Sequence, residues 1–175
     1  MTATPRSQDR AELPGSAPGT TTATAAVALA GRLEGSLVVA VDGSAASSAA
    51  LSFADALAGR LGEPLEIVLV WNFMSGRAVR HASVGQDLQQ AWQRDAQDLL
   101  QESVRTALPT PRAAGLRLHA VHGNAVPVML AVSRSAAQLV IGSRGHGGFA
   151  GLLLGSTSEQ VLRHAECPVT VVRSR

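Results

Sequence analysis

The sequence predicts an α/β domain: a single open sheet of five parallel strands with helices on both faces. Five short apolar runs alternate with longer segments that carry helical periodicity or helix-start signals. Such alternation is typical of a parallel sheet whose strands are joined by right-handed crossover helices. The chain has 175 residues and no internal repeat, so we expect one folded domain.

Residues 1–33 are predicted to form a disordered N-terminal tail, and residues 34–175 the folded domain. The tail is rich in alanine, threonine, proline, glycine and serine, and three of its first eighteen residues are proline. This composition buries too little apolar surface to offset the conformational entropy lost on ordering. A helical turn near residues 24–32 is the only regular structure that we consider in the tail.

The first half of the domain is predicted to contain two strands and two helices. A run of β-branched residues forms the first strand, and Asp42-Gly43-Ser44 after it are turn and helix-start residues. The following helix has apolar residues at helical spacing and ends at Gly62. Pro109 stops the second helix, which is polar and amphipathic. The predicted order is strand 37–41, helix 45–61, strand 65–71, loop 72–84 and helix 86–108.

The second half is predicted to contain three strands and two helices. Apolar and polar residues alternate in the third strand, and Asn124 is placed to cap the helix after it. Pro127 is tolerated because it falls in the first turn of that helix. The fifth strand follows Cys167-Pro168. The predicted order is strand 116–121, helix 125–135, strand 139–141, helix 155–165 and strand 169–173.

A glycine-rich loop follows the fourth strand, with the pattern Gly142-x2-Gly145-x9-Gly155-Ser156-Thr157. Glycine permits positive φ and lets a ligand approach the main chain closely. Backbone N–H groups in such a turn form a concave nest for an anion, and a helix start adds further N–H donors. Ser156 or Thr157 is placed to cap the helix. The loop is therefore predicted to cradle phosphate, and Gly142→Ala and Gly155→Ala are expected to weaken binding; a plain flexible connection is the alternative.

The loop matches neither of the common nucleotide motifs. A P-loop requires Gly-x4-Gly-Lys-[Ser/Thr], and the chain contains no lysine. The dinucleotide fingerprint places three glycines within six residues after the first strand, whereas this loop lies near the C-terminus.

Asp42 follows the first strand, at the edge where open α/β sheets bind ligands. It is a candidate for binding a ribose hydroxyl or a ligand amine. In the alternative, Asp42 or Ser44 only caps the first helix of the domain. The glycine loop follows another strand at the same edge, and this convergence favours the ligand-binding interpretation.

The composition narrows the class of protein. The 15 basic residues are all arginine, are scattered along the chain and leave a formal charge of only +2, so a nucleic-acid footprint is not expected. No apolar run reaches the roughly 18 residues of a membrane span, and no secretion signal is recognised. The single cysteine, Cys167, excludes an internal disulfide and fits a reducing compartment. A cytoplasmic location is expected.

These motifs together resemble the universal stress protein family, specifically its ATP-binding branch. The resemblance covers about residues 36–173 and depends on Val41-Asp42-Gly43-Ser44, Gly123, the complete glycine loop, and the closing stretch from Arg163 to Val169. It implies a Rossmann-like fold of the adenine nucleotide alpha hydrolase type. One departure is Gln138, where the family often has an aspartate before the fourth strand.

The resemblance implies ATP as the ligand, with Mg²⁺ bridging its phosphates. The aspartate after the first strand contacts the nucleoside in this family, which points to Asp42 with Ala40 nearby, and the adenine is walled by Val70 and the adjacent Trp71. Family members commonly form homodimers through the last strand, which implicates Val169, Val171 and Val172. The phosphates would be held by Gly142, Ser143, Arg144, Gly145, Gly155, Ser156 and Thr157.

Two classes of function follow from such a site. In the first, the protein is a regulatory stress-response module in which ATP occupancy alters its dimer or a partner surface. In the second, it is a slow ATPase or a self-phosphorylating enzyme, with His146 in the loop as the candidate base. Phosphoryl transfer requires an aligned nucleophile and strong charge stabilisation. The sequence supplies no carboxylate partner for His146, which favours the binding module. Arg144 is expected either to contact phosphate or to point into solvent.

Overall fold

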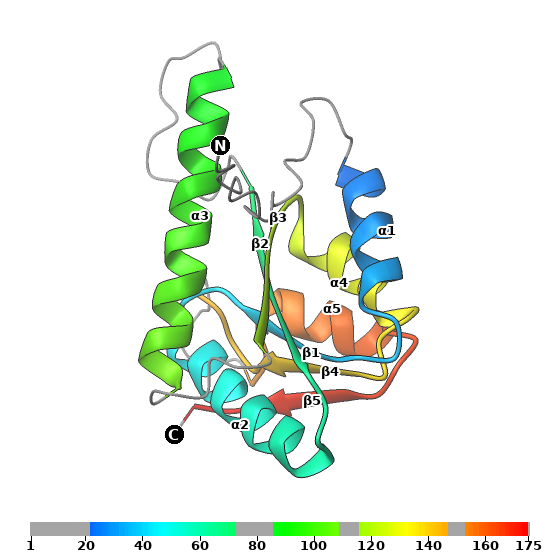
Figure 1. Cartoon of the computed structure of the whole chain (residues 1–175). Helices are drawn as coiled ribbons and strands as arrows, with labels where there is room; N and C mark the ends of the chain where they lie inside the picture. Colours follow the sequence, from blue (N-terminus) through cyan, green and yellow to red (C-terminus); the bar gives the residue numbers. More distant parts are fainter. Residues whose placement is uncertain (1–21, 73–85, 109–115, 147–152, 175) are drawn as a thin grey trace, which may run out of the picture.

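The computed structural model describes residues 22–72, 86–108, 116–146 and 153–174 (Figure 1). Within them, five parallel strands form one sheet in the order β3-β2-β1-β4-β5, which confirms the predicted fold class. The predicted loop 72–84 falls outside the described residues except for Asn72. The elements are α1 (Thr22–Arg32), β1 (Leu37–Val41), α2 (Ala45–Leu61), β2 (Leu65–Trp71), α3 (Gln86–Ala107), β3 (Leu116–His122), α4 (Ala125–Ser133), β4 (Gln138–Gly142), α5 (Ser156–His164) and β5 (Val169–Val172).

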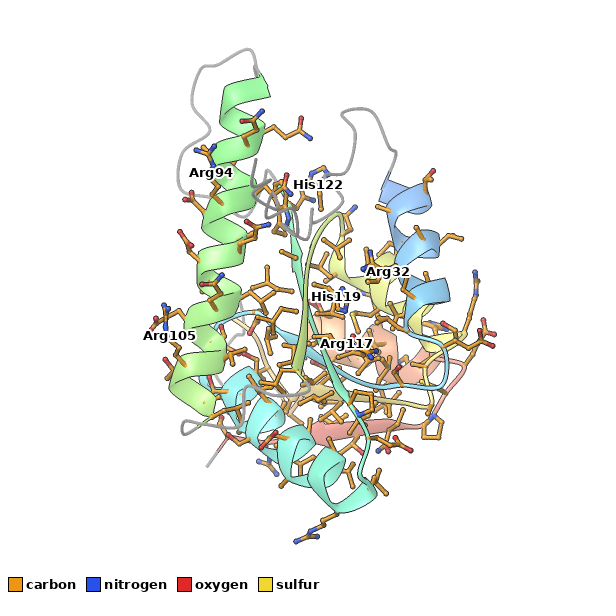
Figure 2. The ribbon with its side chains drawn as sticks, in the orientation of Figure 1. Arg32, Arg94, Arg105, Arg117, His119 and His122 are labelled. Carbon is orange, nitrogen blue, oxygen red and sulfur yellow. The ribbon has the colours of Figure 1, made fainter. Side chains whose placement is uncertain are left out.

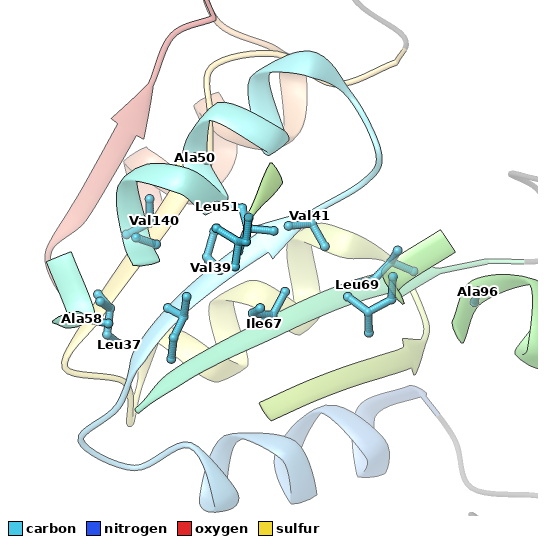
Figure 3. Packing of buried hydrophobic residues seen from close by; sticks show 14 residues of the cluster. Leu37, Val39, Val41, Ala50, Leu51, Ala58, Ile67, Leu69, Ala96 and Val140 are labelled. Carbon is cyan, nitrogen blue, oxygen red and sulfur yellow. The ribbon is translucent and has the colours of Figure 1, made fainter. Parts of the chain in front are cut away.

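Helices cover both faces of the sheet, as predicted. Figure 1 shows α2 and α3 on one side and α1, α4 and α5 on the other. Successive strand side chains point to opposite faces, so Val39 packs in the core under α2 whereas Val38 packs in the core under α1 and α4. Figure 3 shows the first of these cores, where Ala50 and Leu51 of α2 lie over β1. Both cores bury short aliphatic side chains from the strands, which is why the apolar runs predicted the strands well.

The strand order changes direction between β1 and β4, because the chain leaves β1 toward β2 and β3 and later returns to the other side of β1. Ligands of open α/β sheets bind at such a point, outside the carboxyl ends of the strands. Asp42 follows β1 and Gly142 ends β4, so the two predicted ligand-binding segments meet there.

The prediction of a disordered tail up to residue 33 is wrong for its last part. Residues 22–32 form the complete helix α1, which packs against α4. Alanine has the highest helix propensity, and the buried residues Ala26, Leu29, Ala30 and Leu33 fall at i, i+3, i+4 and i+7, which gives an apolar stripe. The overall composition of the tail concealed this local periodicity. Residues 1–21 lie outside the described residues.

Hydrogen bonds join the end of α1 to the end of α4. The Ser135 hydroxyl donates to the Ala30 carbonyl (2.6 Å), and the Gly35 N–H donates to the Ser135 carbonyl (2.8 Å). These bonds satisfy carbonyl groups that a helix C-terminus leaves without an intrahelical partner. The helix α1 is therefore part of the folded domain.

One carboxylate is buried inside the sheet. The side chain of Glu66 in β2 is 1% exposed and accepts hydrogen bonds from two residues of the edge strand β3: Arg117 through Nη1 (2.8 Å) and His119 through Nε2 (2.7 Å). Figure 2 shows Arg117 and His119 following each other along β3. Buried charges are tolerated where they are paired and hydrogen-bonded, and this arrangement meets both conditions.

None of the described helices is long and apolar enough to cross a membrane.

Candidate functional site

The glycine loop leaves β4 and returns to α5 through a closed base. The Gly155 N–H donates to the Ser143 carbonyl (2.7 Å), which brings the two ends of the loop together. The Ser143 N–H donates to the Val172 carbonyl of β5 (2.7 Å), and the Ser158 hydroxyl donates to the Gly142 carbonyl (2.7 Å). These bonds hold the described parts of the loop against the sheet and α5. Residues 147–152 of the loop lie outside the described residues.

The helix α5 begins with donors that no side chain caps. Its N-cap is Gly155, so the prediction that Ser156 or Thr157 caps this helix is wrong. The first N–H groups of a helix lack intrahelical acceptors, and the macrodipole adds partial positive charge there. Because glycine has no side chain to satisfy these donors, the start of α5 is suited to an anion.

Gly142 and Gly145 of the loop are required for space, whereas an added Cβ at Gly155 would make ordinary contacts, and none of the three glycines has positive φ. A Cβ on Gly142 would lie 2.8–2.9 Å from backbone atoms of Ala46 and Ser47 in α2. A Cβ on Gly145 would fall on the carboxylate oxygen Oδ2 of Asp42, and one on Gly155 would lie 3.4 Å from the Cα of Arg144. The space beside Gly142 is thus occupied by the backbone of α2. The sequence had predicted that glycine is needed here to let phosphate approach the main chain, and that reason does not apply.

The structure decides which of Asp42 and Ser44 caps α2. Ser44 is the N-cap of α2, and its hydroxyl oxygen accepts a hydrogen bond from the Ser47 N–H (3.2 Å). Asp42 accepts from the Ser44 N–H through Oδ1 (3.0 Å), while its Oδ2 faces Gly145 of the loop. The Ser44 hydroxyl also lies 3.3 Å from the Arg144 carbonyl, which ties the start of α2 to the loop. Asp42 is therefore held in place by the turn and directed toward the loop.

These segments enclose a cavity of about 310 Å³ at the point where the strand order changes direction. The volume lies at the lower end of the range for small-molecule sites, about 300–1,000 Å³. Of the ten residues that the sequence predicted for the site, nine line this cavity: Ala40, Asp42, Val70, Gly142, Arg144, Gly145, Gly155, Ser156 and Thr157.

The tenth predicted residue, Ser143, is buried and does not line the cavity. Its backbone joins the loop base instead, as described above. Trp71, considered for the adenine wall, also lies elsewhere, because consecutive residues at the end of β2 point to opposite faces of the sheet.

Beyond Ala40 and Val70, the sequence did not predict the apolar wall of the cavity. Side chains from both sheet and helices form it: Val68, Ala125, Met129, Ile141 and Val161. Met129 and Val161 belong to the apolar faces of α4 and α5. The sequence pattern predicts that such residues lie in the hydrophobic core and does not indicate that they line a cavity. Because the wall is apolar and the loop side carries N–H donors, the cavity suits a ligand with a flat apolar part and an anionic part.

His146 lies at the rim, with its Nε2 atom 3.0 Å from the Asp42 carbonyl oxygen. A carbonyl oxygen only accepts, so Nε2 carries the proton in this contact and Nδ1 is the basic nitrogen of the neutral ring. Arg144 lines the cavity with an exposed side chain. Among the described residues, no group of three or more histidine, cysteine or acidic side chains could hold a metal ion.

The family model of the Universal stress protein family matches residues 35–173, which is most of the chain. The chain belongs to this family. The match begins after α1, so that helix lies outside the shared part of this universal stress protein.

Curated relatives match over shorter stretches. Universal stress protein Rv1996 of Mycobacterium tuberculosis (strain ATCC 25618 / H37Rv) is 39% identical over 80 residues, which cover 44% of this chain and 25% of the relative. Universal stress protein Rv2623 of the same organism is 34% identical over 85 residues, 46% of this chain and 29% of the relative. The aligned part thus spans about a quarter of the length of these relatives.

Solved structures share the fold. Universal stress protein UspA from Lactobacillus plantarum superposes with a TM-score of 0.63 at 22% identity, covering 80% of this chain and 99% of that one. A universal stress protein in complex with cAMP superposes with a TM-score of 0.57 at 24% identity, covering 82% of this chain and 99% of that one. At these identities the likeness establishes the fold alone.

Cys167 lies near the start of β4 and is partly buried against the apolar core under α4 and α5. Burial raises the pKa of its thiol, so at mildly alkaline pH it carries less thiolate than free cysteine. Because the thiolate is the nucleophile, we expect the folded protein to react with Ellman's reagent more slowly than the same protein in urea. Equal rates in the folded and unfolded protein would contradict the burial of this thiol.

Proposed function

We propose that this universal stress protein binds ATP with Mg²⁺ in the 310 Å³ cavity and acts as a nucleotide-dependent regulatory module of the stress response. The observation that carries the proposal is the junction of a helix start without a side-chain cap, a glycine loop and an apolar wall around one cavity. Each part fits a different part of the nucleotide.

The phosphates would lie at the loop and the start of α5. Ser156 and Thr157 lie in the first turn of α5, whose uncapped N–H groups face this side of the cavity. Arg144 adds a guanidinium that donates charge-assisted hydrogen bonds to phosphate oxygens. Mg²⁺ commonly binds through substrate phosphates and retained waters, so the cavity does not need a dedicated cluster of metal ligands.

The nucleoside would lie between the ends of β1 and β2 and the helices α4 and α5. Val70, Met129 and Val161 offer an apolar surface for a base, and Asp42 offers a carboxylate to a ribose hydroxyl. The relative solved with cAMP binds an adenine nucleotide, which supports an adenine nucleotide as the ligand class. Asp42 is the only acidic side chain among the described residues of the cavity lining.

Hydrolysis or self-phosphorylation receives less support from the geometry. The candidate base His146 directs Nε2 at the Asp42 carbonyl, and no acidic side chain within the described residues forms a hydrogen bond with its ring. General-base catalysis needs a group within hydrogen-bond reach of the proton that it removes. The binding module is therefore the function that we propose.

The proposal includes a homodimer and a cytoplasmic location. The strand β5 lies at one edge of the sheet, where a backbone ladder is open to a second chain. Val169, Val171 and Val172 are half-buried there and supply apolar surface next to that edge.

Calorimetric titration with Mg-ATP tests the proposed function. We expect saturable binding in the micromolar range for the wild-type protein. Gly145→Ala should weaken it about tenfold, because the added methyl group displaces the Asp42 carboxylate and removes a hydrogen bond to the ligand. Gly31→Ala is the matched control, since a Cβ there meets nothing within 4 Å. Heat equal to dilution at millimolar Mg-ATP would refute the proposal.

A further inference from the structure

A second cavity, of about 480 Å³, adjoins the nucleotide cavity. It lies between the end of β2 and the helix α3, and its described lining includes Trp71, Trp92, Asp95 and Leu99. Asp42, Val70 and His146 line both cavities, so they form a shared wall. Neither the family match nor any feature of the nucleotide cavity assigns a ligand to this space.

The shared wall is closely packed. The contact between the His146 Nε2 atom and the Asp42 carbonyl closes it on the loop side. Gly43, with a φ of 85°, passes beneath α3 so closely that an added Cβ would lie 3.0 Å from Leu99 Cδ1 and 3.4 Å from His146 Nε2. The helix α3, the turn after β1 and the glycine loop thus contact one another between the two cavities.

The two cavities differ in charge. The first receives Arg144 and the start of α5, both of which favour an anion. The second contains two carboxylates, Asp42 and Asp95, and no arginine among its described lining residues, while the chain has no lysine. In the described part of the chain Asp95 forms no ion pair. The second cavity is therefore unsuited to phosphate.

Both tryptophans of the chain line the second cavity. The face of an indole ring carries negative charge density and attracts a cation, most strongly when the cation is removed from water. Two indoles and two carboxylates around one space are the chemistry that recognises an amine or a guanidinium group. The volume falls within the range of small-molecule sites.

We propose that the second cavity binds a small organic cation with an amine or guanidinium group, held by Asp95 and the two indoles beside the nucleotide. The two ligands would be separated by the wall that Asp42, Val70 and His146 form. This site goes beyond ATP binding and adds a second ligand class to the protein.

The probe is agmatine, which carries both cationic groups. Because the only two tryptophans line the cavity and the chain has no tyrosine, intrinsic fluorescence reports directly on this site. We expect a saturable change in emission, with about tenfold weaker binding in Asp95→Asn, where a charge-assisted hydrogen bond is lost. Asp98→Asn is the matched control, because Asp95 and Asp98 are both exposed on α3 and only Asp95 lines the cavity. It should leave the affinity unchanged.

Two further measurements complete the test. Butylurea, a neutral analogue of the guanidinium end, should give no saturable change. Mg-ATP should bind Asp95→Asn with unchanged affinity, since Asp95 lines only the second cavity, and this separates the new site from the nucleotide site. A flat agmatine titration up to millimolar concentration, equal binding of butylurea, or an equal loss in Asp98→Asn would overturn the proposal.

Discussion

Gly142→Ala is expected to destabilise the folded protein by about 3 kcal/mol, the upper end of the usual cost of overpacking. The added Cβ would lie 2.8 Å from the Ala46 carbonyl carbon and 2.9 Å from the Ser47 nitrogen. These are backbone atoms in the first turn of α2, so no side-chain rotation relieves the contact. Relief requires α2 to move away from β4, which would open the core that contains Val140 and Ala50.

Urea unfolding followed by circular dichroism measures this loss, and Gly31→Ala is the matched control. Gly31 lies inside α1, where a Cβ meets nothing within 4 Å, so alanine should stabilise the protein by about 0.5–1 kcal/mol. A Gly142→Ala variant as stable as wild type would show that α2 yields to the methyl group at little cost.

The spacing of the glycines in the sequence indicated a ligand-binding loop, but it did not indicate why each of these positions needs glycine. Gly142, Gly145 and Gly155 are spaced as a loop motif, and the spacing located the cavity. Whether a missing Cβ makes room for a ligand, a helix or a carboxylate depends on what lies across from it. That neighbour comes from another strand or helix, so only the folded chain reveals it.

The strands and central helices were predictable because local and tertiary preferences agree. Apolar β-branched runs form the buried strands β1, β2 and β4, and turn residues mark their ends. The helix α1 was expected as no more than a helical turn in a disordered tail, because composition was averaged over a segment that also contains three prolines. Its alanine content and its apolar spacing both favour a helix once residues 22–33 are considered alone.

The buried Glu66 could not be predicted from the pattern of its own strand. A single acidic residue in an apolar run predicts a side chain that faces solvent. Its partners lie on β3, where the register pairs Glu66 with Arg117 and Val68 with His119. Sheet order and register bring these residues together across about fifty positions of sequence, beyond the reach of local periodicity.

Removing both partners of Glu66 is expected to cost about 3–5 kcal/mol of stability, the largest effect that we expect from any exchange in the sheet. In the double variant Arg117→Ala/His119→Ala the carboxylate, 1% exposed, would lose both of its hydrogen-bond partners, including the arginine that pairs with its charge. An unpaired carboxylate in an apolar core has lost its hydrogen bonds to water, and no protein group replaces them. Urea unfolding measures the cost.

Adding Glu66→Leu to this double variant should restore most of the stability, because replacing a buried ionic cluster by apolar residues is often neutral. Arg105→Ala is the surface control, since the exposed pair Arg105–Glu102 should contribute less than about 1 kcal/mol. The comparison separates charge from packing. If the triple variant is no more stable than the double, the loss comes from the missing Arg117 and His119 side chains themselves, and the buried carboxylate does not carry the cost.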